Sequence, residues 1–131
     1  EQYVSAAALV RFARELLPDE LLAGRQASLD ARMVADLARQ GEGGAVAAFG
    51  RMGQWLGIAL ASLINTRNLE AVVIGGGVAA SFDLLLPSLA AELVQRCFPQ
   101  IASGCTIVRT GLGDDAGLLG GAALAKAKVA G

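Results

Sequence analysis

The sequence predicts a helix-rich α/β fold in which two short parallel strands enclose a helix as a βαβ unit. The first observation is the run Ala71–Ile74, four apolar and mostly β-branched residues that lead directly into Gly75–Gly77. A run without polar alternation is typical of a strand buried on both faces. The second observation is another strand-like run, Cys105–Arg109, which follows a helical segment. The third is the helical spacing of apolar residues before Ala71.

The first half of the chain predicts three helices and a connector at Leu21–Gln26. Ser5 is the expected N-cap of the first helix, because its hydroxyl can accept a hydrogen bond from the first turn. Gly41 suits the C-terminal cap of the second helix. The helices are predicted over Ala8–Leu17, Leu29–Gln40 and Ala45–Asn65. Their inward-facing residues are predicted to be Leu9, Phe12, Ala13 and Leu16; Leu29, Met33, Val34 and Leu37; and Phe49, Gly53, Leu56, Leu60 and Leu63.

The third predicted helix also carries a face of small residues. Glycine inside a helix costs up to about 1 kcal/mol relative to alanine. We therefore expect another element to pack against this face, backbone to backbone. The same helix holds Trp55, which we interpret as a core or interface residue, with stacking on a ligand as the alternative. The small residues are Gly50, Gly53, Gly57 and Ala61.

The second half predicts a helix, a strand and a final helix after the glycines. Pro87 is expected in the first turn of a helix that ends near Cys97, with Phe98-Pro99 as its stop. The final helix is predicted over Ala116–Lys128, capped by Asp114 or Asp115. The βαβ connection is expected to be right-handed. The inner residues of the middle helix are predicted to be Leu89, Leu93, Val94 and Cys97, and those of the second strand Ile107 and Val108.

This order divides the chain into a helical part, residues 1–66, and a βαβα part, residues 67–131. Two strands make too small a sheet to cover so much apolar helix. We therefore expect the remaining strands of the sheet to come from sequence upstream of this chain.

The glycine run is the strongest candidate for a ligand site. Gly75–Gly77 can turn at positive φ, and without Cβ atoms they let a ligand approach the backbone. In α/β sheets ligands bind beyond the carboxyl ends of strands, where this loop would lie. The alternative is a tight strand-to-helix turn that binds nothing.

Two named glycine motifs fit this loop poorly. No Lys-Ser or Lys-Thr pair follows the glycines, so the loop is not a Walker A motif. The spacing from Gly75 through Gly77 to Ala80 has the form G-x-G-x-x-A, but a Rossmann dehydrogenase would then carry an acidic residue after the next strand. That strand ends in Arg109, which would suit only a 2′-phosphate.

Composition excludes several classes of function. The formal net charge is −1 and no Lys/Arg cluster exists, so nucleic acid and acidic membranes are not indicated as partners. The chain has no histidine, so it cannot hold a Ser-His or Cys-His mechanism. Cys97 and Cys105 are interpreted as free buried thiols, with a disulfide or metal pair as the alternative. No zinc spacing, signal peptide or membrane span is present in the pattern, and a cytoplasmic location is the default.

Four segments of this sequence resemble the ROK family, which comprises bacterial sugar kinases, including glucokinases, and related repressors. The similarity covers nearly the whole chain, but it resembles only the carboxyl-terminal part of a family member. The segments are Glu1–Ser5, Gly53–Gly57, Asn68–Gly77 and Gly113–Ala125.

The resemblance implies a partial actin-like ATPase lobe, one of two ribonuclease-H-like lobes that close on a nucleotide. Gly75, Gly76 and Gly77 match the family's adenosine-binding loop, whose backbone lies against the nucleotide. In the parent protein this implies ATP and Mg²⁺ as cofactors, a hexose as substrate and a homodimer. The apolar composition, 54% of residues, also favours self-association.

Three more residues match functional positions of the family. Gly117 and Gly120 match small residues of its last helix, at the hinge between the lobes. Glu1 matches the glutamate that hydrogen-bonds sugar hydroxyls; the alternative, favoured for a free chain end, is a solvated carboxylate. The phosphate-binding loops, the catalytic aspartate and the zinc ligands of the family all precede Glu1, so we assign no catalytic residue and no metal ligand here.

The leading hypothesis is therefore the carboxyl-terminal part of an ATP-dependent hexose kinase, inactive in isolation. The first alternative is the effector-binding lobe of a sugar-responsive repressor. The second is a Rossmann-type oxidoreductase domain, which NADP(H) binding would indicate.

Overall fold

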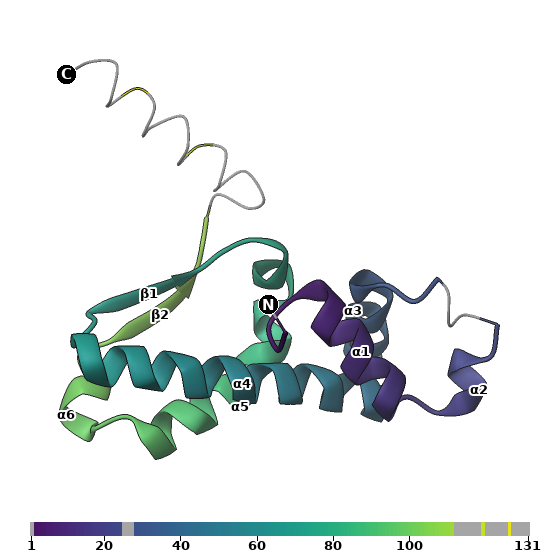
Figure 1. Cartoon of the computed structure of the whole chain (residues 1–131), viewed down its shortest axis with the longest axis horizontal. Helices are drawn as coiled ribbons and strands as arrows, with labels where there is room; N and C mark the ends of the chain where they lie inside the picture. The colour runs from purple at the N-terminus through teal and green to yellow at the C-terminus, as the bar shows by residue number, and fades with distance from the viewer. Residues whose placement is uncertain (1, 25–27, 112–118, 120–125, 127–131) are drawn as a thin grey trace.

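The computed structural model describes residues 2–24, 28–111, 119 and 126 (Figure 1). Four helices come first, followed by a strand, a short 3-10 turn, two more helices and a second strand. The elements are α1 (Ala6–Leu16), α2 (Asp19–Leu22), α3 (Ala31–Arg39), α4 (Gly43–Arg67), β1 (Ala71–Ile74), η1 (Gly77–Ser81), α5 (Phe82–Arg96), α6 (Pro99–Ala102) and β2 (Thr106–Arg109).

The helix caps follow the sequence. The Ser5 hydroxyl accepts a hydrogen bond from the Ala8 amide at 3.1 Å, as predicted. Gly41 has φ +85° just beyond α3, which confirms it as a left-handed helix terminus. The connector at Leu21–Gln26 is wrong in part, because α2 occupies Asp19–Leu22. Proline before Asp19 starts this turn, and Leu22 is buried beneath it.

The axis of the molecule is the pair α4 and α5, which run in the same direction: Gly53 lies against Leu85, and Asn65 near the end of α4 bonds Arg96 at the end of α5. Figure 1 shows α4 running along the molecule, with the sheet over one end and α1 and α3 over the other. The predicted small-residue face is confirmed, because α5 packs against it. A Cβ built on Gly53 would lie 2.6 Å from the Leu85 carbonyl oxygen, and one on Gly57 would lie 2.6 Å from the Glu92 Cβ. Only hydrogen at these two positions allows the helices to approach so closely.

The prediction that Pro87 lies in a first helical turn is wrong. α5 begins at Phe82 and continues through Pro87, which is its sixth residue. Proline has no amide hydrogen, so the helical hydrogen bond from position 87 to the carbonyl of Asp83, in the first turn, is missing. Leu85 and Leu89 on either side are fully buried. Their burial fixes the helix where its own backbone bonding is weaker.

The two strands pair in parallel, as the βαβ prediction requires. Val72 lies opposite Ile107, and Val73 lies opposite Val108. The expected burial of β1 on both faces is wrong. Val73 is 64% exposed, and Val108, predicted to be buried, is exposed as well. Among the described residues, helices cover the face of this two-stranded sheet that carries Ile74, and alternate residues of each strand are exposed.

The core of the described residues consists of two clusters along the α4/α5 pair. The first joins α1, α3 and the start of α4 around Phe12, Phe49 and Met52. The second joins the end of α4 to α5 and β1 around Ile64 and Leu89. Residues of α4 belong to both clusters. The predicted division of the chain into residues 1–66 and 67–131 stays a prediction.

Several predicted inner residues are exposed. Leu63 is 51% exposed and Val94 is 82% exposed. Leu16 is also exposed, and Leu17 is buried in its place. Helices that meet through glycine faces turn their large side chains away from the contact, which explains the first two errors. Trp55 is not a core residue either, since it is exposed and its ring lies 4.5 Å from that of Tyr3.

Both cysteines are free thiols, as the sequence interpretation favoured. Cys97 is buried after the end of α5, and Cys105 is half-buried before β2. Burial, and then the neighbouring Cys105 thiol, raise the pKa of Cys97 above its ordinary value. Within the described ranges, no helix is long and apolar enough to cross a membrane.

Candidate functional site

A cavity of about 840 Å³ opens between the glycine loop and the helices of the first half. This volume lies within the range of small-molecule and cofactor sites. Its walls come from four regions: the start of α1, one face of α3, the first half of α4, and the segment from the end of β1 into η1. The lining residues are Ser5, Ala6, Leu9, Ala31, Arg32, Ala35, Asp36, Arg39, Phe49, Met52, Gly75, Gly76, Gly77, Ala80 and Ser81.

The glycine loop forms one wall of the cavity. Gly76 has φ +71° and ψ −168°, a conformation that essentially only glycine adopts. Its carbonyl accepts a hydrogen bond from the Ala79 amide at 2.9 Å, which starts η1. The positive φ expected of the glycines is therefore found at Gly76, and Gly77 already belongs to η1.

The space beside these glycines is open. A Cβ on Gly76 or Gly77 would meet no atom of the described chain within 4 Å. A Cβ on Gly75 would make an ordinary contact with the Thr110 methyl at 3.6 Å. The packing of the chain therefore does not explain why Gly77 lacks a side chain. All three glycines are exposed at the cavity wall.

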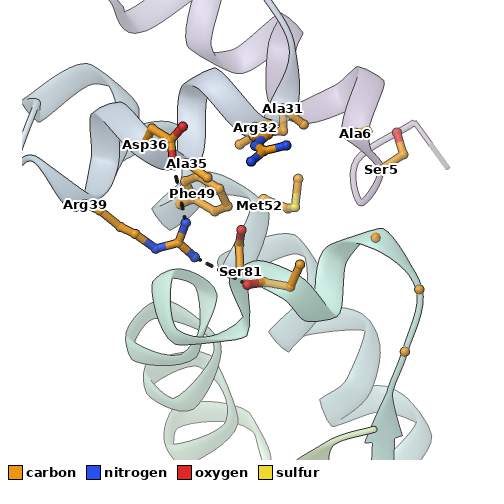
Figure 2. A pocket seen from close by; sticks show the side chains of 15 residues that line it. Ser5, Ala6, Ala31, Arg32, Ala35, Asp36, Arg39, Phe49, Met52 and Ser81 are labelled. Atoms are coloured by element: carbon orange, nitrogen blue, oxygen red, sulfur yellow. Dashed lines mark hydrogen bonds and ion pairs between the residues drawn. The ribbon is translucent and has the colours of Figure 1, made fainter. Parts of the chain in front are cut away.

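The opposite wall is a charged stripe on α3. Arg39 reaches across the cavity and donates a hydrogen bond to the Ala80 carbonyl at 3.3 Å. Its guanidinium also lies 3.6 Å from the Asp83 carboxylate at the start of α5. On its own helix it lies 3.9 Å from the Asp36 carboxylate (Figure 2). Arg39 thus links α3 with η1 and α5 across the cavity.

Arg32 lies two helical turns before Arg39 on the same face of α3. Figure 2 shows its guanidinium pointing into the space near Met52 and Ser81. Asp36 pairs with Arg39 instead, and no ion pair or hydrogen bond of Arg32 is found among the described residues. The wall therefore carries two arginines and one aspartate, a net charge of +1.

The floor of the cavity is apolar. Phe49 and Met52 of α4 lie there with Leu9 of α1, and all three are buried. An apolar floor between a bare backbone and a cationic wall suits a ring with one polar edge. Within residues 2–24 and 28–111 no cluster of three or more metal-binding side chains is found.

The structure brings together only part of the predicted site. Gly75, Gly76 and Gly77 lie side by side on one wall. Glu1, Gly117 and Gly120, together with most of the predicted last helix at Ala116–Lys128 and its cap, lie outside the described residues.

The sequence prediction missed the α3 wall. Arg32, Asp36 and Arg39 recur at i, i+4 and i+7, which places them on one helical face. That spacing was the available signal. It has the same form as an ordinary solvated face, and nothing local shows that the glycine loop lies opposite.

The chain matches the family model described as ROK family over residues 1–128. It is 33% identical to a glucokinase of Thermotoga maritima over 137 aligned residues, 100% of this chain and 43% of that protein. It is 30% identical to a xylose repressor of Bacillus spizizenii over 87 residues, 66% of this chain and 23% of that protein.

Among solved structures, the chain resembles a ROK family glucokinase from Streptomyces griseus in complex with glucose and AMPPNP. The TM-score is 0.80 at 29% identity, and the match covers 95% of this chain and 43% of that one. The chain thus spans less than half the length of the glucokinases it matches. None of the matches named here is an oxidoreductase.

Proposed function

Because this chain belongs to the ROK family, we propose that it forms the carboxyl-terminal part of an ATP-dependent hexose kinase. Its role there is to bind the adenosine of ATP against the backbone of Gly75, Gly76 and Gly77. The described helices and parallel sheet would be part of one lobe of an actin-like ATPase fold. The S. griseus relative holds glucose and AMPPNP, which supports a hexose and ATP as substrates.

The observation that carries this proposal is the open space beside Gly76 and Gly77 at the end of a parallel strand. A bare backbone at the carboxyl end of β1 faces a cavity of suitable volume. A turn that served only to connect β1 with η1 would need glycine at position 76 alone. Glycine at position 77 is explained when a ligand occupies the place of a side chain.

In the parent enzyme, an aspartate outside this chain would deprotonate the sugar hydroxyl. Mg²⁺ and backbone amides would stabilise the transferring phosphoryl group. Glu1 would contact the sugar, and Gly117 and Gly120 would lie at the hinge between lobes. A zinc site is expected upstream of Glu1, and we expect a cytoplasmic homodimer.

The proposal is tested by NMR titration of the chain with adenosine and ADP. We expect saturable shifts of the amide signals of Gly75–Gly77 and of their cavity neighbours, and no phosphorylation of glucose by the chain alone. NADP⁺ serves as the comparison ligand. Saturable NADP⁺ binding without adenosine binding would indicate the oxidoreductase interpretation, and glucose phosphorylation by the chain alone would contradict the assigned role.

The match to a xylose repressor supports a second candidate, the effector-binding lobe of a sugar-responsive regulator. In that case the cavity would have lost its nucleotide. Adenosine and ADP would then leave the Gly75–Gly77 signals unchanged, while a pentose or hexose would shift signals elsewhere in the chain.

A further inference from the structure

We propose that Arg32 covers the base of the nucleotide, stacking its guanidinium plane on the face of the ring that points away from Gly75–Gly77. This inference rests on the proposed nucleotide-binding function and goes beyond it by naming a contact on the α3 wall.

The first argument is position. Arg32 and the glycine loop line the same cavity from different elements, α3 on one side and the end of β1 on the other. Figure 2 shows the guanidinium pointing into the space between these walls. A flat ring lying on the glycine backbone would therefore present its second face toward this side chain.

The second argument is charge. Arginine beside aspartate four residues later on a helix would ordinarily form an ion pair. Here the Asp36 carboxylate lies 3.9 Å from Arg39, and Arg39 also engages Asp83 and the Ala80 carbonyl. The guanidinium of Arg39 is thus already engaged by groups of the chain on both walls of the cavity. The charge of Arg32 is available to a ligand, since the described part of the chain offers it no ion pair.

The third argument is the chemistry of the floor. Phe49 and Met52 are buried beneath the cavity and offer no hydrogen-bond donor to an anion. Such a floor accommodates the apolar face of a purine better than a phosphate. A guanidinium is planar, weakly hydrated and stacks on aromatic faces, whereas a lysine ammonium does not. The base, and not the phosphates, is therefore the assigned partner of Arg32.

The test measures the affinities of adenosine and ADP for the wild-type chain and for Arg32→Ala and Arg32→Lys. Arg32→Ala should weaken both ligands equally, by about three- to tenfold, as expected for loss of a cation–π contact. Arg32→Lys should recover less than half of that loss on a logarithmic scale. In the wild type, adenine H2 or H8 should give intermolecular NOEs to the Arg32 side chain.

Arg67→Ala is the matched control. Arg67 is exposed in the last turn of α4, about 22 Å along the helix from Met52 at a rise of 1.5 Å per residue. Its loss should leave both affinities unchanged. Circular dichroism of each variant checks that the fold is retained, as expected for two exposed arginines.

Each remaining outcome is decisive. Weakening of ADP alone would assign Arg32 to the phosphates and overturn the base contact. Unchanged affinities in Arg32→Ala, with the wild type binding adenosine normally, would overturn the inference and leave the proposed function intact. A wild-type chain that binds neither ligand would overturn the proposed function and this inference with it.

Discussion

Replacing Gly53 with alanine tests the close contact between α4 and α5. The new Cβ would lie 2.6 Å from the Leu85 carbonyl oxygen, 3.1 Å from the Ser88 Cβ and 3.3 Å from the Leu89 amide nitrogen. Two of these three atoms belong to the backbone of α5 and cannot rotate away. Relief of the overlap requires the helices to separate by roughly half an ångström or more, and overpacking of this kind costs about 1–3 kcal/mol.

The substitution also brings a gain that must be subtracted. Alanine is about 1 kcal/mol more favourable than glycine inside a helix. We therefore expect Gly53→Ala to lower the free energy of unfolding by a net value of up to about 2 kcal/mol. Urea denaturation followed by far-ultraviolet circular dichroism measures this change.

Gly50 provides the matched control one turn earlier on the same helix. A Cβ there would lie 3.3 Å from the Ser88 hydroxyl oxygen, the movable end of a side chain. Gly50→Ala should therefore keep most of the helix-propensity gain and leave the chain as stable as the wild type or slightly more so. Equal stabilities of the Gly50 and Gly53 variants would refute the close approach of α4 and α5.

Three further predictions follow from other parts of the structure. Gly77→Ala should change the free energy of unfolding by less than about 0.5 kcal/mol, because its Cβ meets open space. The same substitution should weaken the affinity for adenosine about tenfold, or roughly 1.4 kcal/mol. Unchanged affinity in the NMR titration would argue against adenosine binding at the glycine loop. The Asn65 side-chain amide donates a hydrogen bond to the Arg96 carbonyl at 2.8 Å and accepts one from the Phe98 amide at 3.1 Å. Asn65→Ala should therefore lower the free energy of unfolding, measured by urea denaturation, by about 1 kcal/mol. A stability equal to that of the wild type would show that water replaces both bonds. Burial raises the pKa of Cys97 above its ordinary value of 9.0, so the unfolded chain loses this thiol proton at a lower pH than the folded chain. The free energy of unfolding should therefore fall as pH rises from about 9 through the higher folded pKa. Cys97→Ala should show a shallower fall over that window, and parallel curves for the two proteins would contradict a raised Cys97 pKa.

The elements that the sequence predicted well are those set by local chemistry. Ala71–Ile74 forms a strand that pairs in parallel. The Ser5 hydroxyl caps the start of α1, and Gly41, which has no Cβ, adopts the positive φ that follows α3. The glycine face of α4 was predictable because glycine inside a helix is unfavourable unless a neighbour needs the space.

The errors concern what lies opposite each element. Val73 and Val94 are apolar and correctly placed on a strand and a helix, but their exposure depends on which faces neighbouring elements cover. Pro87 was misplaced for the same reason, since the burial of Leu85 and Leu89 sustains a helix that local rules would end. Burial of a given face is a tertiary property, and a pattern of apolar residues indicates only that the face can be buried.

In the candidate site, too, the sequence identified the residues with a local signal and missed those that only tertiary packing brings there. Gly75, Gly76 and Gly77 form a contiguous motif with a local physical meaning, so they could be selected from the sequence. Arg32 and Arg39 are separated from that motif by some 40 residues and face it only because α3 packs across the start of α4. Before folding, their charges are indistinguishable from those of any exposed helix.

Pro87 has a mechanical consequence for the molecule. It lies between Leu85, which belongs to the cluster beneath the cavity, and Leu89, which belongs to the cluster beneath the sheet. The missing amide of Pro87 removes one backbone bond from α5 at this boundary. We therefore expect α5 to bend more easily at this boundary than within either cluster, so that the sheet end and the cavity end of the molecule can tilt relative to each other.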